Sequence, residues 1–325
     1  MDRQFPIKRS PPDERDYRLT ALMVGEVLNE EKVNSNFCGP IYDQGTSGFC
    51  WAFAATAYLN WLYNKHRVNS QHHLSPLFVA QAVKSSTYSD YPQQEGESIR
   101  AAIKGVQKAG SVAEIKYPYG GYGGRLSFPS VDAFLQTISQ RFRVGPYAAV
   151  DTLDEITTSL SLGNPVLAGV LWTDRYLQGY QLDFPFGTVI GGHAILLLDN
   201  YPNKVLFGRK GWIKFQNSWG EDWGESGFGW ISHDYLRHVD QQLGFGFLLD
   251  GYSALYVENG IPPYEIEMQI DNHTIVADDV IYITDTAPKI GSDNRTYLPV
   301  RSLTEVVGYD VQWEPLQKRI ELRKK

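Results

Sequence analysis

The sequence is poor in cysteine and in basic residues. It has two cysteines, Cys38 and Cys50, among 325 residues, so at most one disulfide could form and the chain is no disulfide scaffold. If one of the two is catalytic, even that bridge is excluded. Lysine and arginine number 30 against 37 aspartates and glutamates, for a net charge of −7. Because no net positive field is available to attract phosphates, we expect no nucleic acid partner.

The segments that export or anchor a protein are also missing from the sequence as written. No run approaches the roughly 20 apolar residues of a membrane span, and residues 1–6 lack the apolar stretch of a secretory signal. We therefore expect no membrane span and, on the sequence as given, a cytoplasmic protein. A surface or secreted location is the alternative if a signal was trimmed.

The length of the chain and the changes in residue pattern along it predict more than one domain. Hydrophobic residues make up 42% and charged residues 21%, as in globular proteins, and 325 residues suggest two domains or one domain with an appendage. Polar, aperiodic residues come first, then helix-like apolar patterns, then short β-prone runs, and finally a separate unit after a Gly- and Pro-rich linker. The expected parts are an arm (1–35), a main domain (36–258), the linker (259–264) and a terminal domain (265–325).

Three segments of the main domain predict specific helices and strands. Residues 50–62 are apolar nearly all round, which favours a buried central helix. Ser75 followed by Pro76 is a helix start, and the pattern from Ile99 to Ala109 ends at a glycine. Beyond about residue 140 the short apolar runs punctuated by Gly, Pro and Asn predict strands.

The stretch from Tyr42 to Phe53 carries the first chemical signal. A glycine-punctuated loop leads into the apolar helix, and Cys50 stands at its start, where the positive end of the helix dipole favours a reactive thiolate. Gln44 lies where a loop could fold its amide back beside the sulfur to donate to an oxyanion. For an isolated cysteine, a buried and inert thiol opening a core helix is the alternative.

The partners that such a thiolate needs occur later in the chain. His193 stands at the head of a strand-like run, and Asn217 precedes Ser218 and Trp219. An imidazole can act as general acid and base for the thiol, and a side-chain amide can orient the ring. Trp219 could cover the hydrogen bond between His193 and Asn217 and keep water from it.

Taken together, these motifs resemble the papain family of cysteine peptidases, in its bacterial branch, over residues 36–258. The resemblance implies an α+β fold of two lobes, a helical left lobe and a β-barrel right lobe, with the active site between them. It implies Cys50 as the nucleophile, His193 as its base and Asn217 as the residue that orients the ring. Gln44, with the backbone N–H of Cys50, is implied to form the oxyanion hole.

The same resemblance implies substrate-binding positions and shows departures from the family. Gly96, Gly192 and Trp219 match substrate-binding positions. Ser47 stands where many members have a disulfide cysteine, and Glu97 replaces a second glycine beside Gly96, which puts backbone binding of substrate there in doubt.

Residues 265–325 contain the run Asn294-Arg295-Thr296-Tyr297-Leu298-Pro299-Val300-Arg301-Ser302-Leu303 and, after it, Gly308-Tyr309-Asp310-Val311-Gln312-Trp313-Glu314. With these motifs the terminal segment resembles the stalk domain, also called the copper amine oxidase N-terminal-like domain, of bacterial surface proteins. It implies a small α/β unit with a short helix from Val300 to Val307, acting as a spacer or contacting the cell envelope. One histidine, His273, is too little for a copper site. The other histidines and the acidic residues match neither zinc nor calcium spacing, so no metal is expected.

The function we expect is a cysteine endopeptidase that hydrolyses peptide bonds of a protein or peptide substrate through an acyl-enzyme, with no cofactor. Two alternatives are a catalytically silent protein that binds peptides or cell-envelope material, and an acyl transferase or transpeptidase that uses the same nucleophile.

The role of the arm has two interpretations. Prolines near its start disfavour a helix, so an extended arm is expected. It could lie in the cleft and imitate substrate, with Phe5, Tyr17 or Leu19 in an apolar pocket. The alternative, in which residues 16–19 pack on the outside of the fold, is slightly favoured.

Overall fold

The computed structural model describes most of the first 254 residues and, beyond them, mainly strands. The described residues are 4–10, 13, 16, 18–19, 27–66, 73–87, 95–120, 128–140, 142–241, 244–254, 266–268, 274–277, 280–283, 289–290, 292, 296–297, 309–314 and 319–324. The chain divides into two compact units, Met1–Lys65 with His73–Val257, and His66–His72 with Glu258–Lys325. Each is described by itself below.

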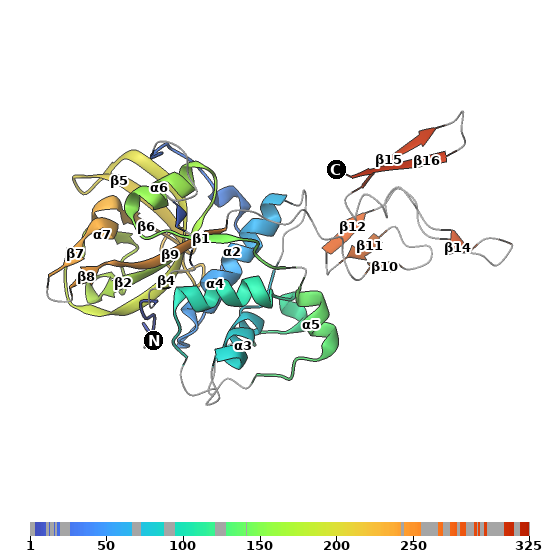
Figure 1. Ribbon diagram of the computed structural model, residues 1–325, viewed down its shortest axis with the longest axis horizontal. Helices are drawn as coiled ribbons and strands as arrows, with labels where there is room; N and C mark the ends of the chain where they lie inside the picture. The colour runs from blue at the N-terminus through green and yellow to red at the C-terminus, as the bar shows by residue number, and fades with distance from the viewer. Residues whose placement is uncertain are drawn as a thin grey trace. The chain divides into compact units, whose positions relative to one another are not determined.

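The first unit combines helices from its earlier part with a sheet from its later part, as Figure 1 shows. The α-helices are α2 (Cys50–His66), α3 (Pro76–Thr87), α4 (Ile99–Lys108), α5 (Ala133–Ser139), α6 (Leu153–Ser161) and α7 (His233–Arg237). Short 3-10 helices span Ser35–Phe37, Glu114–Lys116 and Asp174–Tyr176. No helix among the described residues is long and apolar enough to cross a membrane.

The predicted helix starts are confirmed by their caps. The Ser75 hydroxyl accepts the N–H of Phe78 at 3.0 Å, just ahead of Pro76, and Ser98 accepts the N–H of Ala101 at 3.2 Å at the start of α4. These bonds satisfy backbone donors that the first turn leaves open. The apolar face of α4 is buried, and its Gly105 leaves room for a side chain of α3.

Seven strands form one sheet in the order β1-β9-β2-β4-β5-β6-β3. They are β1 (Tyr147–Ala149), β2 (Val166–Thr173), β3 (Gln181–Leu182), β4 (Val189–Leu206), β5 (Arg209–Gln216), β6 (Phe228–Ser232) and β9 (Leu248–Ala254). A separate antiparallel pair joins β7 (Val239–Asp240) and β8 (Phe245–Gly246). The α+β architecture is confirmed. The predicted barrel is a sheet whose edge strands β1 and β3 do not pair with each other among the described residues.

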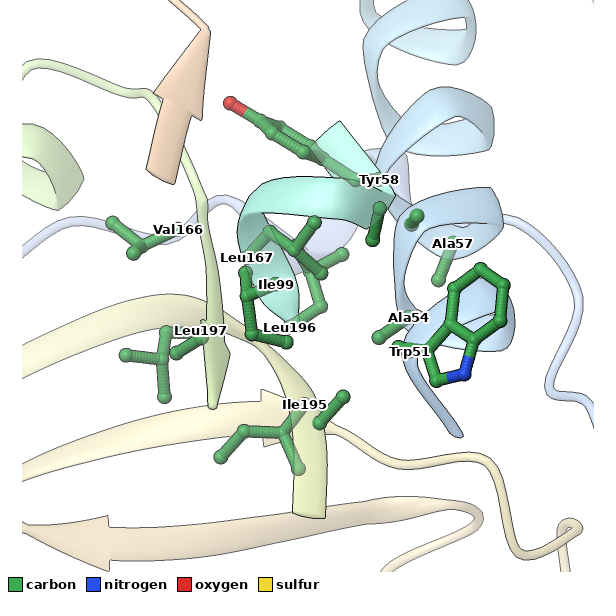
Figure 2. Packing of buried hydrophobic residues seen from close by; sticks show 14 of the residues in the cluster. Trp51, Ala54, Ala57, Tyr58, Ile99, Val166, Leu167, Ile195, Leu196 and Leu197 are labelled. Carbon is green, nitrogen blue, oxygen red and sulfur yellow. The ribbon is translucent and has the colours of Figure 1, made fainter. Parts of the chain in front are cut away.

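The core joins the central helix to the sheet. Trp51 and Ala55 of α2 are fully buried, as are Ile195 and Leu196 of β4, and Figure 2 shows residues from both elements in one cluster. Because α2 is apolar nearly all round, it can be covered on most of its faces, as predicted. This packing brings the start of α2 against β4.

The second unit contains strands β10 (Ile266–Met268), β11 (Thr274–Ala277), β12 (Val280–Ile283), β13 (Lys289–Ile290), β14 (Thr296–Tyr297), β15 (Tyr309–Glu314) and β16 (Arg319–Lys324). Strands β10, β11 and β12 form an antiparallel sheet, and β13–β14 and β15–β16 are antiparallel pairs. The helix predicted from Val300 to Val307 lies outside the described residues, as does His273.

Candidate active site

Cys50 is the first residue of α2 and is fully buried. Burial raises the pKa of its thiol to about 12, while hydrogen bonds with the backbone of Ala194 and with the start of its own helix act in the opposite direction. The predicted effect of the helix start is therefore present, but desolvation outweighs it. Burial therefore favours the neutral thiol, in the direction opposite to the helix start that the sequence predicted to favour the thiolate.

His193 lies on β4 directly before Ala194, the residue whose backbone reaches the Cys50 thiol. Its Nε2 is 2.8 Å from Oδ1 of Asn217. That oxygen also accepts the backbone N–H of Ser218 at 2.8 Å, and a backbone N–H can only donate. Oδ1 is thus the acceptor for both groups, so Nε2 carries a ring proton and donates it to Asn217.

Aromatic rings surround this pair. The ring of Trp219 lies 4.8 Å from that of His193, and Trp172 and Phe5 lie at 5.2 Å and 5.9 Å. Trp219 and Trp172 are buried. An apolar surround strengthens the bond from His193 to Asn217 because water cannot compete for it.

Gln44 connects the loop before Cys50 to the same network. Its backbone N–H donates to the Ser218 carbonyl at 2.9 Å, and its Oε1 accepts the Ser218 hydroxyl at 2.6 Å. Its Nε2 donates to the Ser47 carbonyl at 2.7 Å. The fully buried Gln44 amide is therefore fixed in orientation, and the structure brings all four predicted catalytic residues into one connected set.

Hydrogen bonds hold the loop that lacks the family's cysteine. The Ser47 hydroxyl donates to the Gln44 carbonyl at 2.9 Å, and the Tyr119 hydroxyl lies 2.9 Å from both. The backbone N–H of Gly48 donates to the Glu95 carboxylate, and the Trp51 indole donates to the Glu95 carbonyl at 2.8 Å. These bonds join the loop before Cys50 to the segment that contains Gly96.

A buried ion pair between Lys84 and Glu97 fixes the segment that contains Gly96. Lys84, whose side chain is 1% exposed, donates to the Gly96 carbonyl at 2.8 Å and lies 3.6 Å from the Glu97 carboxylate. Glu97 also accepts the N–H of Ser98 at 2.9 Å. Glu97 in place of a second glycine thus serves to anchor Lys84. No sequence motif marks Lys84, which lies within helix α3.

The arm runs between the Gly96 segment and β4. The N–H of Ile7 donates to the Gly192 carbonyl at 3.0 Å, and the N–H of Gly192 donates to the Phe5 carbonyl at 3.2 Å. A Cβ on Gly96 would lie 2.6 Å from the Pro6 carbonyl oxygen. Both predicted glycines therefore contact the backbone of an extended peptide, and that peptide belongs to the chain itself.

The preferred interpretation of the arm, in which residues 16–19 pack on the outside of the fold, does not describe residues 4–10. Phe5 lies beside His193, and Gln4 lies against Gly48, next to the nucleophile loop. Further along, Leu19 is buried and Arg18 bridges to Ala149 at β1, so this later part does pack on the sheet. Tyr17 lies outside the described residues.

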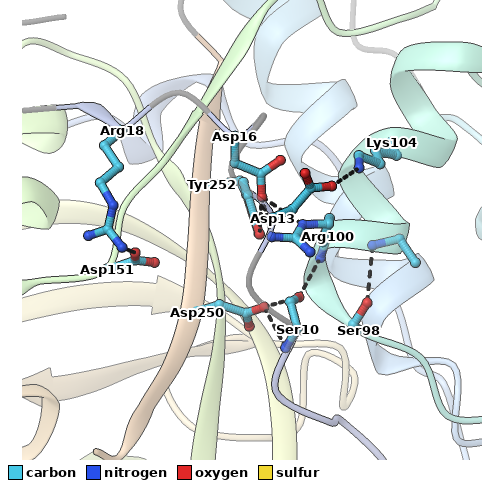
Figure 3. A network of polar contacts seen from close by, with 11 residues as sticks. Ser10, Asp13, Asp16, Arg18, Ser98, Arg100, Lys104, Asp151, Asp250 and Tyr252 are labelled. Atoms are coloured by element: carbon cyan, nitrogen blue, oxygen red, sulfur yellow. Dashed lines mark hydrogen bonds and ion pairs between the residues drawn. The ribbon is translucent and has the colours of Figure 1, made fainter. Parts of the chain in front are cut away.

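Polar contacts anchor the arm beyond the glycines, as Figure 3 shows. Both the N–H and the hydroxyl of Ser10 donate to Asp250 Oδ2, and Arg100 pairs with Asp16. Burial raises the pKa of Asp250 to about 6, against the lowering effect of Ser10 and Arg100. Sequence reasoning missed Asp250 because it lies in an apolar strand with no motif around it.

The described residues contain no group of three or more His, Cys, Asp or Glu side chains that could hold a metal ion.

Comparison with known proteins decides the family. Residues 28–242 match the papain family cysteine protease. The chain belongs to this family. It is 30% identical over 195 residues to germination-specific cysteine protease 1 of Arabidopsis thaliana, covering 58% of this chain and 47% of that protein. It is 28% identical over 214 residues to caricain of Carica papaya, covering 62% and 56%. The chain thus spans about half the length of the curated relatives it matches.

Solved structures show the same fold. Xylellain, a cysteine protease from Xylella fastidiosa, superposes with a TM-score of 0.61 at 20% identity, over 79% of this chain and 97% of that one. The bromelain protease from Ananas comosus, in complex with the E64 inhibitor, gives 0.53 at 20% identity, over 70% and 100%.

The terminal segment matches a second family. Residues 262–322 match the copper amine oxidase N-terminal domain, as the resemblance to the stalk domain predicted. This segment contains a single histidine and no cysteine, which does not fit the nitrogen- and sulfur-rich ligand sets of copper sites.

Proposed function

We propose that the protein is a cysteine endopeptidase that hydrolyses peptide bonds of protein substrates. The observation that carries the proposal is the His193–Asn217 hydrogen bond of 2.8 Å, made beside the backbone of Ala194 that contacts the Cys50 thiol. A thiol at a helix start, a correctly tautomerised imidazole and an orienting amide are the parts that nucleophilic cysteine catalysis requires.

In the proposed reaction, Cys50, His193 and Gln44 act in turn on the substrate peptide bond. His193 Nδ1 takes the thiol proton, and the Cys50 sulfur attacks the peptide carbonyl carbon. The oxyanion accepts hydrogen bonds from the Cys50 backbone N–H and from the second N–H of the Gln44 amide, whose first N–H is used by Ser47. The imidazolium returns its proton to the leaving amine, which leaves an acyl-enzyme. Water then attacks the acyl carbon, gives a proton to His193 and releases the acid and the thiol.

The closed state supports a further part of the proposal, in which the arm is an internal inhibitor. Arm residues use both backbone groups of Gly192 and cover Gly96, so a substrate cannot pair there until the arm leaves. In this docked state the thiol is fully buried and its pKa is raised by that burial. Opening would hydrate Cys50 and let the helix start and His193 lower the thiol pKa.

Active-site labelling tests the catalytic assignment. A thiol-directed epoxide should modify Cys50 stoichiometrically and abolish peptide hydrolysis, whereas the Cys50→Ala chain should take no label and hydrolyse nothing. Hydrolysis by the Cys50→Ala chain would place the nucleophile elsewhere. A chain that is labelled but turns over no peptide would favour the silent binding protein, and ligated peptide products would favour the transferase.

For the second unit we propose a spacer that contacts the cell envelope, which the match to the second family supports. A chain that ends near residue 260 should keep its activity on a short peptide and lose binding to purified cell-wall material. Loss of peptidase activity on truncation would mean that the second unit belongs to the catalytic fold.

A further inference from the structure

The loop that carries Gln44 is closed into a tight turn by hydrogen bonds to one carbonyl. The Gln44 carbonyl accepts the Ser47 N–H at 3.2 Å and the Ser47 hydroxyl at 2.9 Å. The Tyr119 hydroxyl approaches the same carbonyl at 2.9 Å from a segment 75 residues away along the chain. A side chain from outside the loop therefore touches the backbone of the residue that we propose binds the oxyanion.

Tyr119 contacts the nucleophile helix as well as this loop. Its ring lies edge-on to that of Phe53 in α2, with the ring centres 4.8 Å apart, and Phe53 belongs to the same helix as Cys50. Phe53 is 2% exposed, and aromatic rings attract each other in this arrangement. One side chain thus contacts both the helix that positions the Cys50 sulfur and the loop that positions the Gln44 amide.

The backbone of Tyr119 is itself held by a carboxyl group. Glu114 Oε1 accepts the Tyr119 N–H at 2.6 Å, and Glu114 opens the short 3-10 helix Glu114–Lys116. The N–H of Glu114 donates in turn to the His73 carbonyl at 2.8 Å, which joins this segment to the one before α3. Tyr119 is therefore held at its backbone by Glu114 and at its ring by Phe53.

The burial of Glu114 carries a free-energy cost. Its Oε2 is buried and has no hydrogen-bond partner among the described residues. Burial raises the pKa of this carboxyl to about 7, against the lowering effect of the hydrogen bond from Tyr119. Burying a carboxyl group with one oxygen unpaired destabilises a fold. A residue without a carboxyl would avoid that cost, which indicates that the contact with Tyr119 offsets it through the site.

We propose that Tyr119 is a positioning residue for the oxyanion-binding amide of Gln44, and that Glu114 serves the reaction by holding Tyr119 in place. The Tyr119 hydroxyl fixes the Gln44 backbone, so the second N–H of the Gln44 amide stays in place for the oxyanion. Preorganised donors stabilise an oxyanion because they need no rearrangement while its charge develops. This inference rests on the proposed peptidase function because it assigns both residues to the oxyanion of that reaction.

Two reagents that differ in their need for oxyanion donors test the proposal on the full chain. The Cys50 sulfur adds to the carbonyl carbon of a peptide aldehyde, and the oxyanion that forms needs the donors. Iodoacetamide is attacked at its CH2 carbon and releases iodide, so no oxyanion forms. Because the arm must open for either reagent, comparing the inhibition constant of the aldehyde with the alkylation rate removes the effect of the arm.

Tyr119→Phe removes only the hydroxyl group. It should raise the inhibition constant of the aldehyde and lower kcat on a short peptide by at least about fivefold each. KM and the rate of Cys50 alkylation should stay within about twofold. Tyr117→Phe is the matched control, since Tyr117 is buried and its hydroxyl donates to the Pro129 carbonyl at 2.7 Å, outside the Gln44 loop. This control should leave all four quantities within about twofold.

Two variants of Glu114 test its part of the proposal independently. Glu114→Ala removes the acceptor of the Tyr119 N–H and should show the same pattern as Tyr119→Phe. Glu114→Gln keeps an oxygen acceptor and should restore the wild-type values within about twofold. Melting temperatures of all variants verify that they fold.

The proposal is overturned if Tyr119→Phe changes the inhibition constant of the aldehyde no more than Tyr117→Phe does. It is also overturned if aldehyde binding and alkylation weaken in parallel, which would mean general loosening of the site. Equal impairment of Glu114→Gln and Glu114→Ala would refute the role of Glu114. A wild-type chain that hydrolyses no peptide but binds the aldehyde in a Tyr119-dependent manner would refute the proposed function and leave the positioning of Gln44 intact.

Discussion

The docking of the arm against Gly192 can be tested by a substitution at Ile7. Ile7→Ala removes a side chain that is 6% exposed, and such truncations cost about 2–5 kcal/mol. The loss falls on the docked state of the arm, because Ile7 would be solvated once the arm is released. At 1.4 kcal/mol per factor of ten, even 2 kcal/mol raises the undocked fraction about 25-fold.

The assay is the rate at which iodoacetamide alkylates each cysteine, together with kcat/KM on a short peptide. The chain has only two cysteines, so Cys38 is an internal reference. It is a half-buried free thiol whose pKa is raised by burial. Ile7→Ala should accelerate alkylation of Cys50 and raise kcat/KM by at least about tenfold, while Cys38 keeps its rate.

Ile138→Ala is the matched control, since Ile138 is 7% exposed and lies in a separate apolar cluster. It should lower stability by a similar amount without accelerating Cys50. The reasoning is refuted if Ile7→Ala leaves both rates unchanged, or if Cys38 and Cys50 accelerate in parallel, which would mean general loosening of the fold.

Three further predictions concern the site and its supports. Asn217→Ala should lower kcat less than Cys50→Ala, which should abolish turnover, because the first weakens orientation and the second removes the reacting atom; steady-state kinetics that show equal losses would contradict these roles. Lys84→Met should lower the free energy of unfolding by about 3–5 kcal/mol, measured with denaturant, because it leaves the Glu97 carboxylate buried without its cationic partner. The double variant Lys84→Met with Glu97→Gln should recover much of that loss. No recovery would argue against a stabilising ion pair between Lys84 and Glu97. Asp250→Asn should raise the free energy of unfolding by up to roughly 3 kcal/mol at pH 7 and by much less at pH 4.5. The reason is that burial raises the pKa of Asp250 in the folded state from 3.8 to about 6, so ionising this carboxyl destabilises the folded chain increasingly as pH rises between those values. The same gain in unfolding free energy at both pH values would exclude this cause.

Local signals in the sequence were sufficient for helices α2, α3 and α4 and for most of the site. Ser75 caps α3 where expected because capping depends on neighbours three residues away. The catalytic set was found because each member lies in a short motif. Its roles remain predictions, while Gln44, His193 and Asn217 lie in one network with Ser218, and the Cys50 thiol contacts the backbone of Ala194 beside His193.

What the sequence could not predict depends on contacts between distant segments. The pKa of Cys50 is governed by burial beneath the rest of the fold, which no motif at the helix start records. Asp250 binds Ser10, which lies 240 residues away in the chain, and Lys84 binds the Gly96 carbonyl in a different segment. Neither contact is marked by a motif around the residue. The docking of residues 4–10 could not be predicted for the same reason, because their partner Gly192 lies nearly two hundred residues away in the chain.

In the function proposed above, the bonds between the arm and Gly192 make the inhibitor and the catalytic domain parts of one molecule, which changes how substrates compete. A tethered segment meets its own cleft at an effective concentration in the millimolar range, whatever the protein concentration. Dilution therefore cannot release it, and a peptide at micromolar concentration gains access mainly during spontaneous openings. Cutting the chain between the arm and the sheet would abolish this advantage at once, because the freed arm would then be an ordinary short peptide that diffuses away.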